Sequence, residues 1–207
     1  MVRTIRGTLA LALLVPVVTL TACAKSDDTE QTAATDSAAA PAATDVAPPP
    51  AAAPSGAVTD PQIAAIVVAA NNVDIAAGEL AKTKGTDPKV KEFAVRMITD
   101  HTGVNQQATA LVTKLGVTPE ENPTSTQLTQ AGEQERQKLQ GLSGAAFDKA
   151  YIDNEVAYHQ TVLDAIDQTL IPGATNAELK ALLEQTRPAV AAHLDHAKQV
   201  QSQLGGA

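Results

Sequence analysis

Aromatic residues are scarce in this sequence, at 2%, with two Tyr, two Phe and no Trp. Nucleic-acid bases are commonly bound by stacking on aromatic side chains, so a stacking platform is not expected. Basic residues are also outnumbered, at 15 against 23 acidic residues, which gives a formal net charge of −8. A nucleic-acid-binding surface needs clustered Lys and Arg facing the phosphates. The composition therefore argues against a nucleic-acid partner.

Cysteine is nearly absent, because Cys23 is the only one and no intramolecular disulfide can form. Arg3 and Arg6 make the segment before it positively charged. The apolar run Leu9–Leu20 has the length of the hydrophobic region of a signal peptide and is too short to cross a bilayer. It ends in Leu20-Thr21-Ala22-Cys23, which resembles the lipobox of bacterial lipoproteins.

These features predict a signal peptide at residues 1–22 and a mature chain that begins with a lipidated Cys23. Attached acyl chains such as palmitate would anchor the chain stably to a membrane, because more than one chain is buried. Ala24 follows the cysteine in place of Asp, which indicates an outer-membrane lipoprotein facing the periplasm or the exterior. The alternative is a secretory leader followed by a chance cysteine.

Residues 23–57 contain the lipidated cysteine and then mostly Ala, Pro, Ser, Thr and Asp, with Val46 as the only large aliphatic residue. Such a segment cannot bury enough apolar surface to offset the entropy of ordering it. We expect a disordered spacer here and a folded domain at residues 58–207.

The folded domain has helical punctuation throughout. Asp60-Pro61 and Asp87-Pro88 each read as an N-cap followed by proline at the first helical position. Thr175 with Glu178 has the spacing of a capping box. Apolar residues recur every three or four positions, and no strand pattern competes. The expected helices span 60–84, 87–115, 125–140, 144–171 and 175–204.

Four of these helices are long and each has one apolar stripe, which predicts a four-helix bundle. The connection between 115 and 144 is long enough to cross the length of the bundle and contains a short extra helix. A crossover of this kind is typical of the ferritin-like arrangement, so we expect an all-α, ferritin-like fold. Pro188 lies inside the last helix and should kink it.

Histidine is placed unusually in these stripes. Three of the four histidines, His101, His159 and His193, fall in the apolar stripes of three different helices, each near mid-length. Asp74 lies beside the stripe of the first helix, and Glu155 lies one turn before His159. Imidazoles and carboxylates inside a helical bundle are how metal sites are built in this architecture. These five residues are the candidate ligands for iron, zinc or manganese.

Two observations favour a site without metal. The Glu-x-x-His spacing of di-iron bundles is missing, since Ile98, Val156 and Val190 stand three residues before the histidines. Buried histidines can also form a structural polar layer, with Tyr151 and Tyr158 as available partners. Nucleophile motifs and Gly-rich phosphate loops are absent as well, so we expect no catalysis and no cofactor in this interpretation.

Three ordered motifs resemble a bacterial exported family known as domain of unknown function 4142. Phe93–His101 resembles its FA-x-x-M-x-x-DH motif, Gly144–Tyr151 followed by His159 resembles the second, and Pro188 leading to His193-Leu194 resembles the third. The resemblance covers residues 60–204 and implies a ferritin-like fold in an exported or outer-membrane-associated protein. Asp74 stands where the family usually has Glu. The resemblance implies no activity.

Two functional hypotheses follow from the sequence. The first is a membrane-tethered envelope lipoprotein whose bundle binds a protein or ligand, or acts in envelope stress, without catalysis. The alternative is a metal-binding ferritin-like protein that uses the histidines and carboxylates of the apolar stripes.

Overall fold

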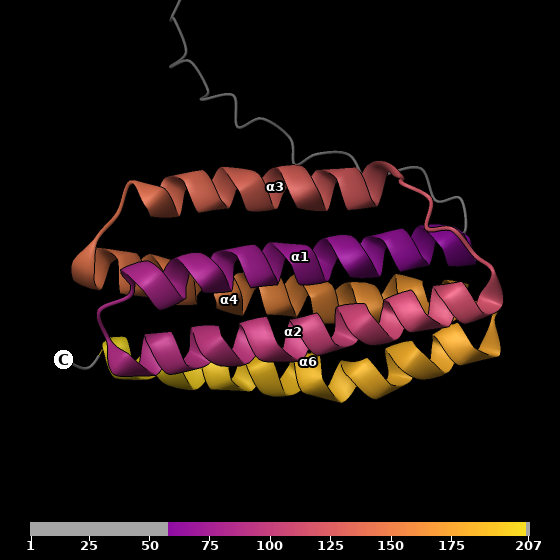
Figure 1. The fold of residues 1–207 in the computed structure, drawn as a ribbon. Coiled ribbons are helices and arrows are strands. Elements are labelled where there is room, and N and C mark those ends of the chain that lie inside the picture. The colour runs from indigo at the N-terminus through magenta and orange to yellow at the C-terminus, as the bar shows by residue number, and fades with distance from the viewer. Residues whose placement is uncertain (1–57, 206–207) are drawn as a thin grey trace, which may run out of the picture. The chain divides into compact units, whose positions relative to one another are not determined.

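The computed structural model describes residues 58–205, and no strand occurs among them. Four long helices dominate this part of the chain, and a fifth helix lies in the connection between the second and third of them (Figure 1). The elements are α1 (Asp60–Lys84), α2 (Pro88–Leu115), α3 (Pro123–Gln140), α4 (Gly144–Ala165), the π-helix η1 (Ile166–Leu170), α5 (Ile171–Gly173) and α6 (Ala177–Leu204). The predicted all-α fold is confirmed.

The helices form a bundle with one crossover. Short connections join α1 to α2 and α5 to α6, so the partners in each pair run antiparallel (Figure 1). α3 runs back along the outside of α1 and returns the chain to the end where α4 begins (Figure 1). The predicted four-helix bundle with a helical crossover is therefore confirmed.

Two predicted caps at the end of the bundle where α1 begins are wrong. The N-cap of α1 is Thr59, whose side chain accepts from the backbone of Gln62 in a reciprocal capping box. The N-cap of α6 is Asn176, whose side-chain oxygen accepts from two backbone N–H groups of the first turn. Asp60 instead contacts the chain just before α6, because its carboxylate accepts from Thr175 N at 2.9 Å and Asn176 N at 3.0 Å. This contact ties the start of α1 to the start of α6.

The crossover helix also begins earlier than predicted, at Pro123 in place of residue 125. Asn122 caps it, because its side-chain oxygen accepts from the backbone N–H groups of Thr124 and Ser125. Asn122 Nδ2 also donates to the carbonyl of Gln62 on α1 at 3.1 Å. The cap therefore positions α3 against α1 as well as satisfying N–H groups of the first turn.

Apolar side chains fill the two halves of the bundle separately. One cluster of buried residues contains Phe93, Met97, Phe147, Tyr151, Ile152, Ala197 and Val200. The second contains Ile63, Ile66, Ile166, Leu170, Leu179, Leu183 and Val190. On each long helix, the buried polar residues other than Asp148 lie between the positions that belong to these two clusters. The middle of the bundle is therefore a polar layer between two apolar ones.

The third long helix changes its winding before it ends. The sequence predicts a helix to residue 171, and the chain does stay helical to Gly173. Within this stretch η1 is a π-helical turn, in which Ile171 N–H donates to the carbonyl of Ile166, five residues earlier. π-turns are wider than α-turns and often occur at functional sites.

α1 is the only described helix long and apolar enough to cross a membrane by length and composition. In the structure it packs against α2, α3 and α4. A helix that is covered by protein on several sides needs apolar residues around most of its circumference. The packing within the bundle accounts for the composition of α1.

α3 approaches α1 closely at Gly132. A Cβ atom at this position would lie 2.6 Å from Val73 Cγ2 and 2.7 Å from Val73 Cγ1. Val is β-branched and has little rotamer freedom in a helix, so it cannot turn aside. α3 also carries two ion pairs at the protein surface, Arg136–Glu133 and Lys138–Glu135.

We predict that Gly132→Ala destabilises the bundle by about 1–2 kcal/mol, because overpacking against Val73 outweighs the better helix propensity of Ala. The matched control is Gly103→Ala on α2, where a Cβ meets nothing within 4 Å. That variant should gain up to about 1 kcal/mol. Urea unfolding followed by circular dichroism measures both, and equal effects at the two sites would contradict the close packing of α3 on α1.

Candidate metal centre

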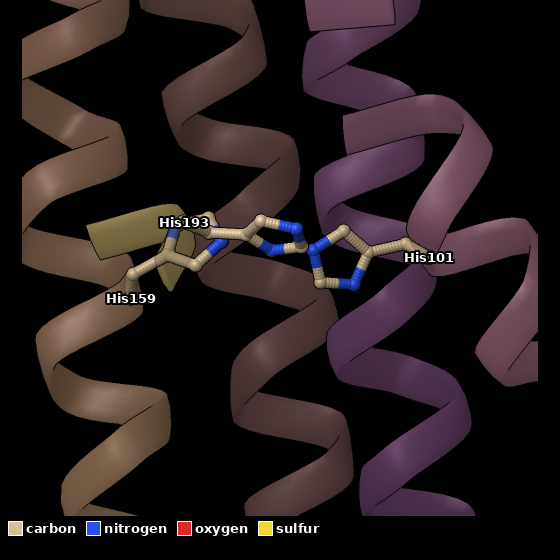
Figure 2. Close-up of side chains that lie close together, drawn as sticks. All are labelled: His101, His159 and His193. Atoms are coloured by element: carbon tan, nitrogen blue, oxygen red, sulfur yellow. The ribbon is translucent and has the colours of Figure 1, made fainter. Parts of the chain in front are cut away.

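The three histidines of the apolar stripes meet in the middle of the bundle. His101 comes from α2, His159 from α4 and His193 from α6, and Figure 2 shows their side chains gathered together. Their ring centroids lie 5.2–5.7 Å apart. One ring nitrogen of each lies within 4.8 Å of one from each of the others. The three residues are only 5%, 1% and 2% exposed, so the cluster is enclosed by protein.

Each ring uses one nitrogen in a hydrogen bond to an acceptor of the protein. His101 Nδ1 donates to Asn71 Oδ1 at 2.8 Å, and His159 Nδ1 donates to the backbone carbonyl of Glu155 at 2.9 Å. His193 Nε2 donates to Asp100 Oδ2 at 2.8 Å. Because all three acceptors lack a proton to give, the proton of each neutral ring is held on the nitrogen that faces the acceptor.

The opposite nitrogen of each ring is buried and has no hydrogen-bond partner. These atoms are His101 Nε2, His159 Nε2 and His193 Nδ1. In the neutral rings each has a free lone pair, which is the form of histidine that binds metal. A hydrogen bond from the other nitrogen fixes the tautomer and the orientation of a ligating histidine in metal proteins. The three rings therefore have the arrangement of metal ligands with their supporting partners.

Two carboxylates complete the polar layer. Asp74 on α1 and Glu155 on α4 are 2% and 0% exposed. A carboxylate oxygen of each and a ring nitrogen of His159 all lie within 4.8 Å of one another. Asp74 Oδ2 also lies 3.4 Å from His101 Nε2. The structure therefore brings the five candidate ligands predicted from the sequence into two overlapping groups that share His159.

The cluster leaves six buried polar atoms without a partner: Asp74 Oδ1, both carboxylate oxygens of Glu155, and the three free ring nitrogens. An unsatisfied buried polar group costs about 1–3 kcal/mol. A bound cation would give these lone pairs a partner and would stabilise the folded state.

Electrostatics at the centre disfavour the charged forms of Asp74, Glu155 and His101. Burial raises the pKa of Glu155 to about 8. Burial, followed by the nearby charge of Glu155, raises the pKa of Asp74 well above its usual range. Burial, followed by the charges of His159 and His193, lowers the pKa of His101 to about 3. Both carboxyl groups lack a positively charged neighbour, which a bound cation would supply. Neutral imidazole rings would not repel that cation.

Sequence reasoning missed the two side chains that orient the rings. Asn71 lies one turn before Asp74 on α1, and its Nδ2 donates to Asn105 Oδ1 at 3.0 Å, which turns its oxygen toward His101. Asp100 is the sequence neighbour of His101, but its carboxylate is bonded to His193. The periodicity of α1 could have indicated Asn71, since an asparagine on a buried face needs a partner.

Other polar residues lie outside the centre or at its edge. Tyr158 is a predicted partner of a histidine, but its hydroxyl donates to the carbonyl of Ala70 at 3.0 Å. Tyr151 is fully buried, and its hydroxyl lies beside the Glu155 carboxyl group without a hydrogen bond of regular geometry. His196 packs edge-on against Phe93 and takes no part in the cluster. Cys23, the predicted lipidation site, lies outside the described residues.

The family described as domain of unknown function (DUF4142) matches residues 45–200. The chain belongs to this family. No curated protein and no solved structure matches the chain. The three motifs that indicate the DUF4142 family in the sequence all reach the centre, through Asp100-His101, His159 and His193.

In this DUF4142 chain Asp148 of the second motif has a structural role. It is 2% exposed and accepts hydrogen bonds from the backbone N–H groups of Thr86 and Asp87 and from the Thr86 hydroxyl. These contacts fasten the connection between α1 and α2 to the start of α4. They hold α1, α2 and α4 in a fixed register, which places Asp74, His101 and His159 at one level.

The donor set fits a divalent transition-metal ion. Imidazole nitrogens suit zinc, iron and copper, whereas magnesium and calcium prefer sites made of oxygen alone. Three neutral imidazoles with two carboxylates would carry a charge of about −2 when both acids are ionised. A dication bound to the three free ring nitrogens would neutralise this charge, with a carboxylate oxygen of Asp74 or Glu155 beside it.

We predict that Glu155→Gln stabilises the metal-free protein by about 1–3 kcal/mol at pH 9, because the buried charge is removed while the shape is kept. The charge of Glu155 costs stability above pH 8, and this cost fades as the pH falls toward 4.5. Thermal unfolding in the presence of a chelator measures the effect. Glu184→Gln, on the exposed surface of α6, is the control and should change nothing. A loss of stability in Glu155→Gln would show that the carboxylate is satisfied without a cation.

Proposed function

We propose that this protein binds one divalent transition-metal ion in the middle of its helical bundle. The observation that carries the proposal is the set of three histidines, each with one nitrogen bonded to the protein and the other buried and unpartnered. The three free nitrogens would be the primary ligands. Asp74 and Glu155 would supply the negative charge and up to two oxygen ligands.

Zinc and iron fit this donor set best among the metals considered from the sequence. Three imidazoles outnumber the carboxylates, and nitrogen ligands favour zinc and iron over manganese in the usual order of affinities. The histidine spacing differs from that of di-iron bundles, so the centre is proposed to hold a single ion. The proposed role is binding and involves no catalytic step.

A structural polar layer without metal is the second candidate. It is favoured by the three hydrogen bonds to Asn71, Glu155 and Asp100, which satisfy half of each imidazole. It accounts less well for the two carboxylates, since three of their oxygens have no partner. A polar layer selected only for stability has no need of two buried acids.

We predict that the purified chain with Cys23→Ser, which removes the one thiol that could compete for metal, binds one equivalent of Zn²⁺ or Fe²⁺. Binding should raise the melting temperature, because the ion binds only the folded state. His101→Ala, His159→Ala and His193→Ala should each weaken binding about 100-fold or more. Titration with a competing chelator and elemental analysis measure affinity and stoichiometry.

His196→Ala is the matched control, because it removes the fourth histidine of the chain without touching the cluster. Asp100→Ala should weaken metal binding by about 10–100-fold, because Asp100 orients His193 without binding the metal itself. This loss is smaller than that of the three histidine variants and larger than that of His196→Ala. Circular dichroism of each metal-free variant shows whether it is folded. Wild-type protein that binds no metal and keeps its melting temperature when Zn²⁺, Fe²⁺ or Mn²⁺ is added would refute the proposal.

We infer a location in the bacterial envelope from the N-terminal sequence. Cys23 after a signal-type segment would be lipidated and would anchor the chain in the outer membrane. Residues 24–57 would then separate the membrane from the bundle. In that position the metal centre would face the aqueous space of the periplasm or the exterior, where it would store, buffer or sense a metal ion during envelope stress.

We predict that mass spectrometry of the native N-terminal peptide finds Cys23 carrying a diacylglycerol and an N-acyl chain such as palmitate. Cys23→Ala should leave the precursor uncleaved and without these acyl chains. An unmodified thiol, or a chain that begins at another residue, would contradict the anchor. Neither result would bear on the metal centre, which is tested separately.

A further inference from the structure

A cavity of about 210 Å³ lies beside the metal centre, in the half of the bundle that contains the second apolar cluster. Its walls come from α1, α2, α4 with η1, and α6, and α3 covers one side. Most of the lining is apolar, including Ile66, Val104, Val162, Leu183 and Val190. An apolar cavity of roughly 150 Å³ in a helical protein binds benzene, so this one has room for a somewhat larger molecule.

One end of this cavity is polar and belongs to the metal centre. Asn71, Asp74 and His101 line it. Asp74 and His101 are 2% and 5% exposed, and Asp74 Oδ1 and His101 Nε2 have no hydrogen-bond partner. The cavity is therefore apolar along its length and ends at two proposed ligands of the metal. His159 and His193 do not line it, which leaves one side of the centre open toward the cavity.

Two irregular features of the helices border the same cavity. The π-helical turn η1 contributes Ile166, Thr169 and Leu170 to its lining. On α6, Thr186 and Val190 line it on either side of Pro188, which cannot donate the backbone hydrogen bond of a regular helix. The cavity therefore lies beside both places where the helices depart from regular α-helical hydrogen bonding. The exposed side chains of Thr161 and Thr169 place one wall of the cavity at the protein surface.

We propose that this cavity binds a small organic molecule whose apolar body lies among the aliphatic side chains and whose Lewis-basic head reaches the metal ion beside Asp74 and His101. This proposal extends the proposed function and rests on it, because the head group of the molecule would bind to the metal ion. Asn71 at this end is already hydrogen-bonded to His101 and Asn105, and the other uncharged polar residues of the lining are threonines, so a single head group at the metal end is the chemistry that fits. The site would make the bound ion a receptor for a ligand of this class.

The probe is 4-phenylimidazole, which joins one metal-ligating nitrogen to one apolar ring, and unsubstituted imidazole is its reference. The protein is loaded with Co²⁺, whose visible spectrum changes when a ligand enters its coordination sphere. We expect 4-phenylimidazole to bind about tenfold or more tightly than imidazole, since the phenyl ring is removed from water in the cavity. Equal affinities of the two probes would overturn the proposal.

Ala165→Phe fills the cavity from α4, where Ala165 is part of the lining. It should abolish the preference for 4-phenylimidazole and leave Co²⁺ stoichiometry and imidazole binding unchanged. Ala157→Phe, at an exposed position two turns earlier on the same helix, is the matched control and should keep the preference. If Ala165→Phe does not fold, Ala165→Leu fills part of the cavity with a smaller side chain and tests the same expectation. A preference that survives in the filled variants would overturn the assignment to this cavity.

A chain that binds neither Co²⁺ nor Zn²⁺, Fe²⁺ or Mn²⁺ would refute the proposed function, and the cavity is then tested without metal. Nuclear Overhauser contacts between the phenyl protons of 4-phenylimidazole and the methyl groups of Val104 and Val190 would support a ligand chamber. Their absence from a folded metal-free chain would overturn it. The two proposals therefore fail through different measurements.

Discussion

The burial of two carboxylates and three imidazoles in the middle of an apolar bundle is the constraint on which the structure depends. Without a bound ion, six polar atoms of these groups are buried without a hydrogen-bond partner, and a buried atom of this kind costs about 1–3 kcal/mol. Apolar residues at the same positions would join the two flanking clusters into one continuous core. A sequence with polar groups at these positions lacks the stability of a continuous apolar core. Binding of the proposed metal ion would compensate for this loss.

The rest of the bundle holds the five side chains at one level. Asp148 fixes the connection between α1 and α2 against α4, and Asp60 fixes the start of α1 against the start of α6. Asn71 and Asp100 then orient two of the rings, and a backbone carbonyl orients the third. Ligands preorganised in this way lose little entropy when an ion binds, so rigidity of the scaffold translates into affinity.

Much of this arrangement could be predicted from the sequence. Helical periodicity indicates four long helices and their approximate ends, and the long connection between residues 115 and 144 indicates the crossover. The positions of His101, His159 and His193 in three apolar stripes predict that they meet. The choice between a metal site and a polar layer needs the hydrogen bonds, because spacing does not show which ring nitrogen is satisfied. On spacing alone the missing Glu-x-x-His pattern argues against a metal.

The features that the sequence did not reveal depend on contacts between distant segments. Asn71 and Asp100 are ordinary polar residues until the packing of α1 on α2 and of α2 on α6 brings them to His101 and His193. Asp60 and Thr175 resemble helix caps when only their local sequence is considered. In the structure they contact each other across the end of the bundle, and Thr59 and Asn176 cap the two helices. The cavity is lined by residues of η1 and by residues on either side of Pro188, and a π-turn leaves no clear signal in a hydrophobic pattern.

Crystals of the zinc-loaded protein test the central claim most directly, through anomalous scattering at the zinc edge. The account predicts one anomalous peak in the middle of the bundle, at about 2.0–2.1 Å from His101 Nε2, His159 Nε2 and His193 Nδ1, with a carboxylate oxygen of Asp74 or Glu155 beside it. Water molecules bridging the same atoms, with no anomalous peak between the three rings, would contradict it.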